Sequence, residues 1–403
     1  MKRILPAIVI SQFFCTSVWF AGNSAIQDII KQFQLDSKWL AHITIALQAG
    51  FIAGTFLFAL LAIADRFSPT RVFIVCALLS SIANIAVTFN SINITAIIYF
   101  RILTGLFLAG VYPVGMKIAA DYYREGLGRS LGFLVGALVL GTALPHLLKA
   151  VSLSLPWKFI FYATSILSVF GAVLIAIFVP DGPFRKAAKT LEITSFLNAF
   201  KQPEFRSAAI GYFGHMWELY AFWMSVPVVL QYYKTQNSIT GLNTSLWSFI
   251  IIAVGSLSCA ASGFIAERTS VRKVATRSLL LSFLCCLLSP VVLISHSVFL
   301  FLVFLLIWGI AVVADSPMFS TLTAANAPAA SKAASLTIVN SIGFAITILS
   351  IQTINLLTIN GTTPYAYLIL ALGPFIGLMA MFRTSSKETP DNSRKCSSHP
   401  QSY

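Results

Sequence analysis

The sequence contains few charged residues: Asp, Glu, Lys and Arg make up only 10% of its 403 residues, and just 13 residues are acidic. Soluble domains carry about 25% charged residues, because their surface faces water. The hydrophobic share is 57%, which one soluble core could not bury, since single cores stop growing at roughly 250–300 residues. The composition therefore argues against a large soluble protein and predicts a chain embedded in lipid.

The spacings that mark metal sites, disulfide frameworks and nucleotide-binding loops are also missing. The sequence has no H-E-x-x-H and no P-loop, and its five histidines do not cluster. Its six cysteines show neither zinc spacing nor a disulfide pattern, which is typical of small buried side chains. We therefore expect no enzyme activity, no metal and no other cofactor.

The net charge of +14 raises the question of nucleic-acid binding. A surface that follows phosphates needs clustered basic residues, and no soluble segment here interleaves basic residues with aromatics. Membrane proteins gather Lys and Arg in their cytoplasmic loops, which by itself makes them basic. The charge thus indicates membrane topology, and we expect no nucleic-acid partner.

Twelve apolar runs are each long enough to cross a bilayer as a helix, which takes about 20 residues. We expect helices, because hydrocarbon offers no partner for an open sheet edge and the runs lack the alternation of barrel strands. The first run could instead be a secretory signal peptide, whose removal would leave eleven spans. The predicted spans of this all-α membrane protein are Ile4–Gly22, Leu40–Ile63, Val72–Phe89, Ile94–Met116, Leu131–Leu148, Trp157–Val179, Ala208–Leu230, Leu246–Ala266, Val274–Ile294, Val298–Leu322, Ala334–Leu357 and Pro364–Phe382.

Lys and Arg set the predicted orientation. With both termini in the cytoplasm, 21 of the 27 basic residues fall on the cytoplasmic side, five fall outside, and Arg101 lies within a span. This asymmetry follows the positive-inside rule. We therefore expect a multi-pass protein of the plasma membrane, in contact with membrane lipid, with both termini cytoplasmic.

A polar segment after the sixth span divides the chain. Residues 180–205 form the longest polar connection before the tail and contain prolines, a glycine and a cluster of basic residues. They predict an N-terminal bundle over residues 1–179, a cytoplasmic linker over 180–205 and a C-terminal bundle over 206–383. The polar tail over 384–403 is rich in Ser, Pro and Lys, which predicts disorder.

Two sequence blocks recur in the second half of the chain, each at the corresponding span. Residues 64–72, after span two, share the order acid, Arg, Ser, base and Val with residues 266–274, after span eight, at a shift of 202. Residues 105–113 in span four match residues 309–317 in span ten at a shift of 204. Two blocks with nearly the same shift predict a duplicated unit of six helices.

The first copies of both blocks resemble motifs of a known family. Asp65, Arg66 and Arg71 resemble the loop signature G-x-x-x-D-R-x-G-R-R between spans two and three of major facilitator transporters, although Leu61 and Ser68 replace its two glycines. The stretch Arg101-x-x-x-Gly105-x-x-x-Ala109 resembles the span-four motif of the same family.

This resemblance covers all twelve spans and implies the major facilitator fold, with two pseudo-symmetric six-helix bundles. It implies a substrate site near the midplane between the bundles, alternating access by rocking, and a small-molecule or ion substrate. We expect a monomer and a symporter in which a proton is the coupling ion.

Two further segments resemble porters grouped with nitrate, nitrite and cyanate carriers. They are residues 215–221 in span seven and 314–320 in span ten. Nitrate porters place an Arg in spans two and eight, and neither Leu40–Ile63 nor Leu246–Ala266 contains one. This difference argues against nitrate itself as the substrate.

Charged side chains within the spans are the first candidates for the mechanism, because each costs at least about 2.5–3.5 kcal/mol at the bilayer centre. Arg101 shares a helical face with Gly105 and Tyr112. It could contact an anion or sense protonation elsewhere, or its head could extend to the outer membrane surface.

Two carboxylates could carry a coupling proton. Glu218 lies near the middle of span seven, one helical turn after His215, so the two side chains could share a proton or a hydrogen bond. Asp315 in span ten is a second candidate, or could instead join helices. Pro317 and its repeat mate Pro113 are expected to kink spans ten and four.

Span eleven carries a polar stripe that could line the central cavity or pack against other helices. Its residues fall on one side of a helix at 100° per residue: Thr337, Asn340, Ser341, Thr347, Gln352 and Asn355. Asn23 and Gln48 could join it from spans one and two.

The two loop repeats predict a gate. Their charged side chains could latch the two bundles together and separate on rocking, or could serve only to set topology. They are Asp65, Arg66 and Arg71 in the first copy and Glu267, Arg268 and Lys273 in the second.

Three functions remain open from the sequence. The leading one is import of a small organic or inorganic anion. Efflux of drugs or metabolites is the alternative within transport, and a receptor or sensor with the same fold is the alternative outside it.

Overall fold

The computed structural model describes residues 3–36, 39–123, 127–152, 155–185, 199–327, 332–359 and 364–385. All regular secondary structure within these ranges is helical. Ten helices are long and apolar enough to cross a membrane. The chain is therefore an all-helical, multi-pass membrane protein, as the composition predicts. Residues 386–403 of the predicted tail, residues 186–198 of the linker and the side chain of Asp65 lie outside the described residues.

The helices up to residue 185, which we call the N-terminal part, begin where the sequence provides caps. Ser68 accepts a hydrogen bond from the backbone N of Arg71 ahead of a proline, and Asn93 accepts one from Ala96. The helices are α1 (Ile4–Thr16), α2 (Ala21–Ser24), α3 (Ile26–Phe33), α4 (Trp39–Leu60), α5 (Ile63–Arg66), α6 (Pro69–Ala86), α7 (Ile94–Leu108), α8 (Tyr112–Tyr122), α9 (Leu127–Val151) and α10 (Lys158–Phe178).

The described helices after residue 198, which we call the C-terminal part, follow a similar order. Ser297 caps its helix by accepting from the backbone N of Leu300, which is the position of Asn93 shifted by 204 residues. The helices are α12 (Pro203–Gln236), α13 (Thr244–Arg268), α14 (Val271–Ile294), α15 (Val298–Ala314), α16 (Ser316–Asn326), α17 (Lys332–Ile359), the 3₁₀ helix η1 (Tyr365–Ala371) and α18 (Leu372–Ser385).

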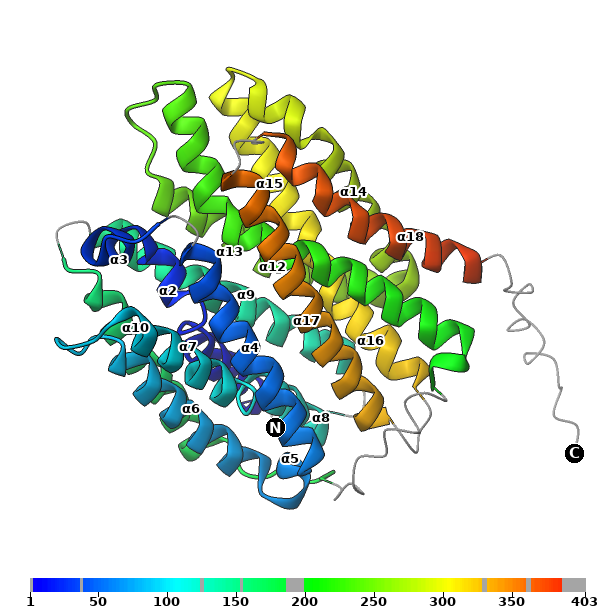
Figure 1. Cartoon of the computed structure of the whole chain (residues 1–403). Helices are drawn as coiled ribbons and strands as arrows, with labels where there is room; N and C mark the ends of the chain where they lie inside the picture. The colour runs from blue at the N-terminus through cyan, green and yellow to red at the C-terminus, as the bar shows by residue number, and fades with distance from the viewer. Residues whose placement is uncertain are drawn as a thin grey trace, which may run out of the picture.

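The two parts lie side by side, with the blue-to-cyan helices of the N-terminal part on one side and the green-to-red helices on the other (Figure 1). The main contacts between them are α4 packed against α17 and α9 packed against α13, and α16 also contacts α9. The surface between the parts is therefore lined largely by α4, α9, α13 and α17.

Three of the predicted spans are broken. The first is interrupted at residues 17–20, between α1 and α2. The fourth and tenth break just before Pro113 and Pro317, each of which occupies the first turn of the next helix. The prediction that these prolines interrupt spans four and ten is confirmed.

Helix α12 has 34 residues and is about 51 Å long at 1.5 Å per residue, enough to cross a bilayer. It is not among the ten apolar candidates, because polar side chains such as His215 and Glu218 occupy its middle. The other predicted span outside the ten is the interrupted first one. The two predicted spans outside the ten are thus an interrupted one and one with polar side chains in its middle.

Glycines allow close packing of α4 on α7 and of α13 on α15. A Cβ on Gly105 would stand 1.9 Å from the backbone oxygen of Leu47, and a Cβ on Gly309 would stand 2.2 Å from that of Ile251. Both members of the first pair map onto the second by the same shift of 204 residues. The repeated span-four block therefore makes the same helix contact in both parts.

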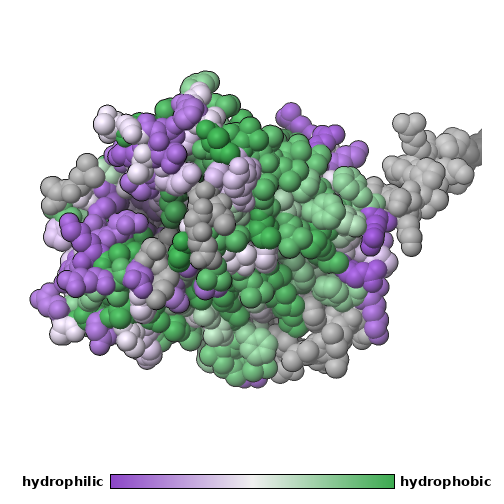
Figure 2. All heavy atoms as spheres, turned by 45° about the horizontal axis from the view of Figure 1, so that its top comes forward, coloured by the Kyte–Doolittle hydropathy of each residue, from purple (hydrophilic) through white to green (hydrophobic). Residues whose placement is uncertain are grey.

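The outside of the molecule is apolar across its middle. Figure 2 shows a broad hydrophobic area with hydrophilic residues gathered toward its margins. Large side chains such as Ile82, Leu257, Val291 and Phe299 are exposed on α6, α13, α14 and α15. Such a surface would be a liability in water and is what a lipid-facing surface requires.

Candidate functional site

The break in the first span is held by the side chain of Arg101. Residues 17–20 are not helical, so the carbonyl groups there must find other partners. Nη1 of Arg101 on α7 donates to Val18 O at 3.0 Å and to Asn84 Oδ1 at 3.3 Å, and Nη2 donates to Trp19 O. Arg101 is fully buried, so its head does not extend to the membrane surface.

The charge of Arg101 has no carboxylate partner within ion-pair distance in the described part of the chain. Its Nε atom is buried and has no hydrogen-bond partner there either. Burying an unpaired charge is costly, and dipoles of carbonyl groups and an amide compensate it only in part. The guanidinium is therefore a place where an anion would be stabilised.

Six buried aromatic side chains meet where the two parts join, and we call them the aromatic cage. Each is at most 2% exposed. The centroids of Trp19 and Tyr220 are 5.6 Å apart, and those of Phe51 and Phe344 are 4.4 Å apart. The cage consists of Trp19, Phe20 and Phe51 from the N-terminal part and Tyr220, Trp223 and Phe344 from the C-terminal part.

Three polar atoms of the cage are buried without a hydrogen-bond partner among the described residues. They are Nε1 of Trp19, Nε1 of Trp223 and the hydroxyl of Tyr220. A buried donor left unpaired costs about 1–3 kcal/mol, and Trp and Tyr usually find a partner when buried. Each of these three donors can donate a hydrogen bond to an acceptor atom of a ligand.

The polar stripe of α17 faces protein, as the sequence suggests. Thr347 donates to Gln48 Oε1 on α4 at 3.0 Å. The hydroxyl oxygen of Ser341 lies 3.3 Å from that of Thr55, which is also on α4. Asn340 accepts from the hydroxyl of Tyr212 at 2.6 Å. The stripe thus makes side-chain contacts with both parts of the molecule.

The remaining predicted polar residues differ in their exposure. Asn355 is buried and Gln352 is half-buried on α17, and Tyr112 is buried at the start of α8. Asn23 donates to Thr44 Oγ1 at 2.8 Å, which joins α2 to α4.

His215 pairs with Asp315, not with Glu218. Nδ1 of His215 on α12 lies 2.8 Å from Oδ1 of Asp315, which stands in the break between α15 and α16. Both side chains are 1% exposed. The other nitrogen of His215 and the other oxygen of Asp315 are buried without hydrogen-bond partners among the described residues. The expected contact between His215 and Glu218 is wrong, because the two side chains turn to different helices.

Glu218 lies inside the C-terminal part, where three side chains donate to one of its carboxylate oxygens. Its Oε1 accepts from Ser282 Oγ at 2.5 Å, from Trp308 Nε1 at 2.6 Å and from Cys286 Sγ at 3.3 Å. These donors come from α14 and α15, which Glu218 thereby joins to α12. The side chain is fixed within one part of the molecule.

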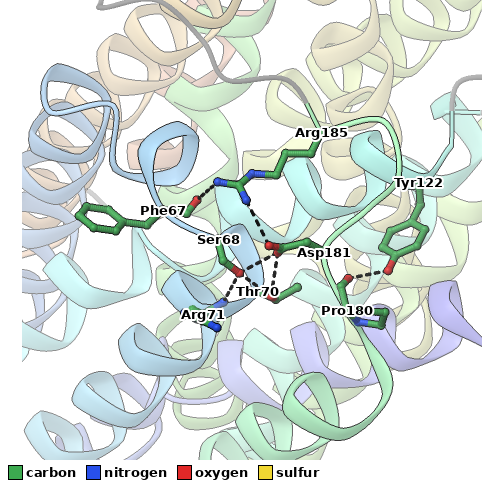
Figure 3. Close-up of polar contacts among 8 residues, drawn as sticks. All are labelled: Phe67, Ser68, Thr70, Arg71, Tyr122, Pro180, Asp181 and Arg185. Carbon is green, nitrogen blue, oxygen red and sulfur yellow. Dashed lines mark hydrogen bonds and ion pairs between the residues drawn. The ribbon is translucent and has the colours of Figure 1, made fainter.

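Asp181, just after α10, organises a polar cluster that the sequence did not suggest (Figure 3). It accepts from Ser68 Oγ at 2.7 Å and from Thr70 Oγ1 at 2.9 Å, and pairs with Arg185 at 3.2 Å. Arg185 also donates to Phe67 O at 2.8 Å. Partial burial raises the pKa of Asp181, but the hydrogen bonds from Ser68 and Thr70 and the charge of Arg185 outweigh it, so the net pKa is lowered.

This cluster lies wholly in the N-terminal part. It ties the loop between α5 and α6 to the end of α10, and Tyr122 adds a hydrogen bond to Pro180 O at 2.5 Å. The side chains of Arg66 and Arg71 are exposed. Those of Glu267, Arg268 and Lys273 are exposed at the junction of α13 and α14. The residues expected to form a gate are placed at the matching loops of the two parts.

The family description of the Major Facilitator Superfamily matches residues 8–351. The chain belongs to the Major Facilitator Superfamily. As a member of this superfamily it is a membrane transporter and not an enzyme. In the described part of the chain, no group of three or more His, Cys, Asp or Glu residues is placed to hold a metal ion.

Two relatives of this Major Facilitator Superfamily protein are informative. The niacin transporter NiaP of Acinetobacter baylyi is 30% identical over 166 residues, which cover 34% of this chain and 36% of that protein. The match therefore spans about a third of that relative's length. The crystal structure of the human organic anion transporter MFSD10 (TETRAN) has a TM-score of 0.73 at 14% identity, over 94% of this chain and 98% of that chain. It shares the fold.

Sequence reasoning missed the aromatic cage and Asp181 in this Major Facilitator Superfamily protein. In the sequence, the cage residues look like ordinary apolar residues of four different spans, and their buried N–H and O–H groups are visible only in three dimensions. Asp181 was assigned to the linker. A signal was present, since an acidic residue directly after a span faces the same membrane side as the loop of residues 64–72.

Proposed function

We propose that this Major Facilitator Superfamily protein is a secondary transporter that moves a small organic anion by alternating access. The observation that carries the proposal is Arg101, a buried cation with no carboxylate partner among the described residues, bound to the broken helix between the two parts. Broken helices and intramembrane charges mark substrate pathways in transporters. An anion beside Arg101 would supply the missing charge.

The names of the relatives favour an organic anion over an inorganic one. NiaP is a niacin transporter, and MFSD10 is an organic anion transporter. Six aromatic side chains beside the broken helix also suit an organic solute better than nitrate. Spans two and eight lack the Arg of nitrate porters.

The architecture we propose has twelve spans in two six-helix bundles, residues 1–179 and 206–383, joined by the linker 180–205. The matching contacts of Gly105 with Leu47 and of Gly309 with Ile251 support it, since both fall at one shift of 204 residues. The interrupted first span and α12 complete the twelve. We place both termini in the cytoplasm, on the asymmetry of Lys and Arg, and propose a monomer in the plasma membrane.

Proton coupling belongs, in this proposal, to His215 and Asp315. Each keeps one polar atom that is buried without a hydrogen-bond partner among the described residues, whereas Glu218 accepts three donors on one oxygen. A proton can bind to the pair with little rearrangement, and the pair stands at the break of span ten.

Counterflow in proteoliposomes tests the substrate class. Arg101→Gln removes the cation and keeps a hydrogen-bond donor, so exchange of labelled organic anions should fall at least about 100-fold, the loss of roughly 2.7 kcal/mol of binding. Arg206→Gln, an exposed site at the start of α12, should exchange as the wild type does. Anion exchange at the wild-type rate in Arg101→Gln would contradict the proposal. Accumulation against a gradient separates a transporter from a receptor.

A further inference from the structure

We propose that the transported anion carries a planar aromatic ring and that this ring binds among the side chains of the aromatic cage. This inference rests on the proposed function and names its substrate class. It is drawn from the composition of the cage, from its buried donors and from its connection to Arg101.

The rings of the aromatic cage are close enough to interact with one another. The cage holds three aromatic side chains from each part, and their centroids are 4.4–6.4 Å apart. The pairs range from stacked to edge-on, as between Phe20 and Trp223 at an interplanar angle of 83°. These are the spacings at which aromatic rings attract one another. If the planar ring of a ligand entered between the two parts, ring–ring contacts within the protein would be replaced by similar contacts with the ligand.

The aromatic cage also contains unpaired hydrogen-bond donors. Trp19, Tyr220 and Trp223 each bury an N–H or O–H group that has no partner among the described residues. An apolar ligand would leave these donors unpaired. A carboxylate, or a ring nitrogen or oxygen, would accept from them. The cage therefore favours a ligand that is aromatic and also carries acceptor atoms.

Trp19 connects the aromatic cage to the charge of Arg101. Trp19 contributes both its ring to the cage and its carbonyl oxygen to Arg101. Because one residue contacts both, the anionic group of the ligand and its ring are separated by no more than a few bonds. A carboxylate attached directly to an aromatic or heteroaromatic ring has this form.

The decisive comparison uses two probes of equal charge and carbon number, benzoate and cyclohexanecarboxylate. Counterflow in proteoliposomes of the full chain should exchange benzoate at least about 10-fold faster at equal concentration. Equal exchange of the two would overturn the ring inference and leave the proposed function standing. Exchange of acetate or other aliphatic anions without benzoate would do the same. No exchange of any organic anion by the folded protein would overturn the proposed function and this inference with it.

Substitutions in the aromatic cage test whether the ring of the ligand binds there. Trp223→Leu removes one cage ring and should lower the preference for benzoate at least about 5-fold, while Trp223→Phe should keep most of it. Phe301→Leu is the control, because Phe301 is a fully buried ring that stacks on Tyr233 away from the cage, and it should keep the wild-type preference. An unchanged benzoate preference in Trp223→Leu, or the same loss in Phe301→Leu, would overturn the assignment of the ring to the cage. Binding of benzoate measured by tryptophan fluorescence in detergent should follow the same order.

Discussion

At the scale of single residues, the buried charges have different partners: Arg101 donates to carbonyl groups of the broken span, His215 pairs with Asp315, and Glu218 accepts from side chains of α14 and α15. Arg101, His215, Glu218 and Asp315 stand out because charge is rare within apolar runs, and all four are buried in the structure. Helical spacing placed His215 beside Glu218, but side-chain direction also depends on the helices packed around α12. Asp315 reaches His215 only because span ten breaks beside it, and no local pattern fixes that meeting.

The His215–Asp315 pair leads to a prediction about coupling. Asp315→Asn removes the ionisable group, so uptake driven by a proton gradient should fall to background, while exchange of substrate across the membrane should persist within about 3-fold. Glu218→Gln preserves the oxygen that accepts from Ser282 and Trp308 and should keep gradient-driven uptake. Proteoliposomes with and without a pH gradient measure both. If gradient-driven uptake were lost only in Glu218→Gln, the coupling proton would instead be assigned to Glu218.

Asp181 gives a residue-scale prediction with a defined pH dependence. Its pKa is lowered in the folded protein, because hydrogen bonds from Ser68 and Thr70 and the charge of Arg185 outweigh the effect of burial. A carboxylate with a lowered pKa stabilises the fold above its unfolded pKa, and this contribution is lost as the pH falls through the folded pKa.

Asp181→Asn should therefore lower Tm at pH 7 by at most about 2 °C, since exposed ion pairs contribute little. The difference between wild type and variant should shrink below about pH 4, where an unperturbed Asp becomes protonated. Tm in detergent from pH 7 to pH 3 measures it. A difference that grows as the pH falls would show that the carboxylate is not the stabilising form.

At the scale of elements, the apolar runs predicted where helices lie, and the caps at Ser68, Asn93 and Ser297 show why they begin there. Pro113 and Pro317 correctly indicated the breaks in spans four and ten. The break at residues 17–20 carries no proline, so nothing in the local sequence marks it. It is stabilised by Arg101, which is about 80 residues away in the chain, and such a long-range cause is invisible to periodicity.

The repeated glycines give a prediction at this scale. Gly105→Ala and Gly309→Ala place a Cβ about 2 Å from a backbone oxygen of the neighbouring helix, and backbone cannot move aside as a side chain can. Each should destabilise the protein by about 1–3 kcal/mol or more, seen as a lower Tm in detergent. Gly241→Ala is the control, because nothing lies within 4 Å of its added Cβ. Equal Tm values for all three variants would show that the two helix contacts do not limit stability.

At the scale of the whole molecule, composition was sufficient for the class and insufficient for the site. A hydrophobic share of 57% and a charged share of 10% can be satisfied only by lipid, and the exposed apolar surface in Figure 2 agrees. The aromatic cage draws on α4, α12, α17 and the broken first span. Each of its rings is unremarkable in its own span, so the cage forms only when the two parts are assembled.

The broken first span also has a consequence for how the protein is made. A chain enters the membrane from its N-terminus, so residues 17–20 reach the bilayer well before Arg101 has been synthesised. Until then the carbonyl groups of Val18 and Trp19 lack the donor that they have in the finished protein, and α1 alone covers only about 20 Å of a hydrocarbon layer about 30 Å thick. We therefore expect the first span to reach its final position only when α7 has been inserted beside it, and the proposed substrate site to be completed only after that step.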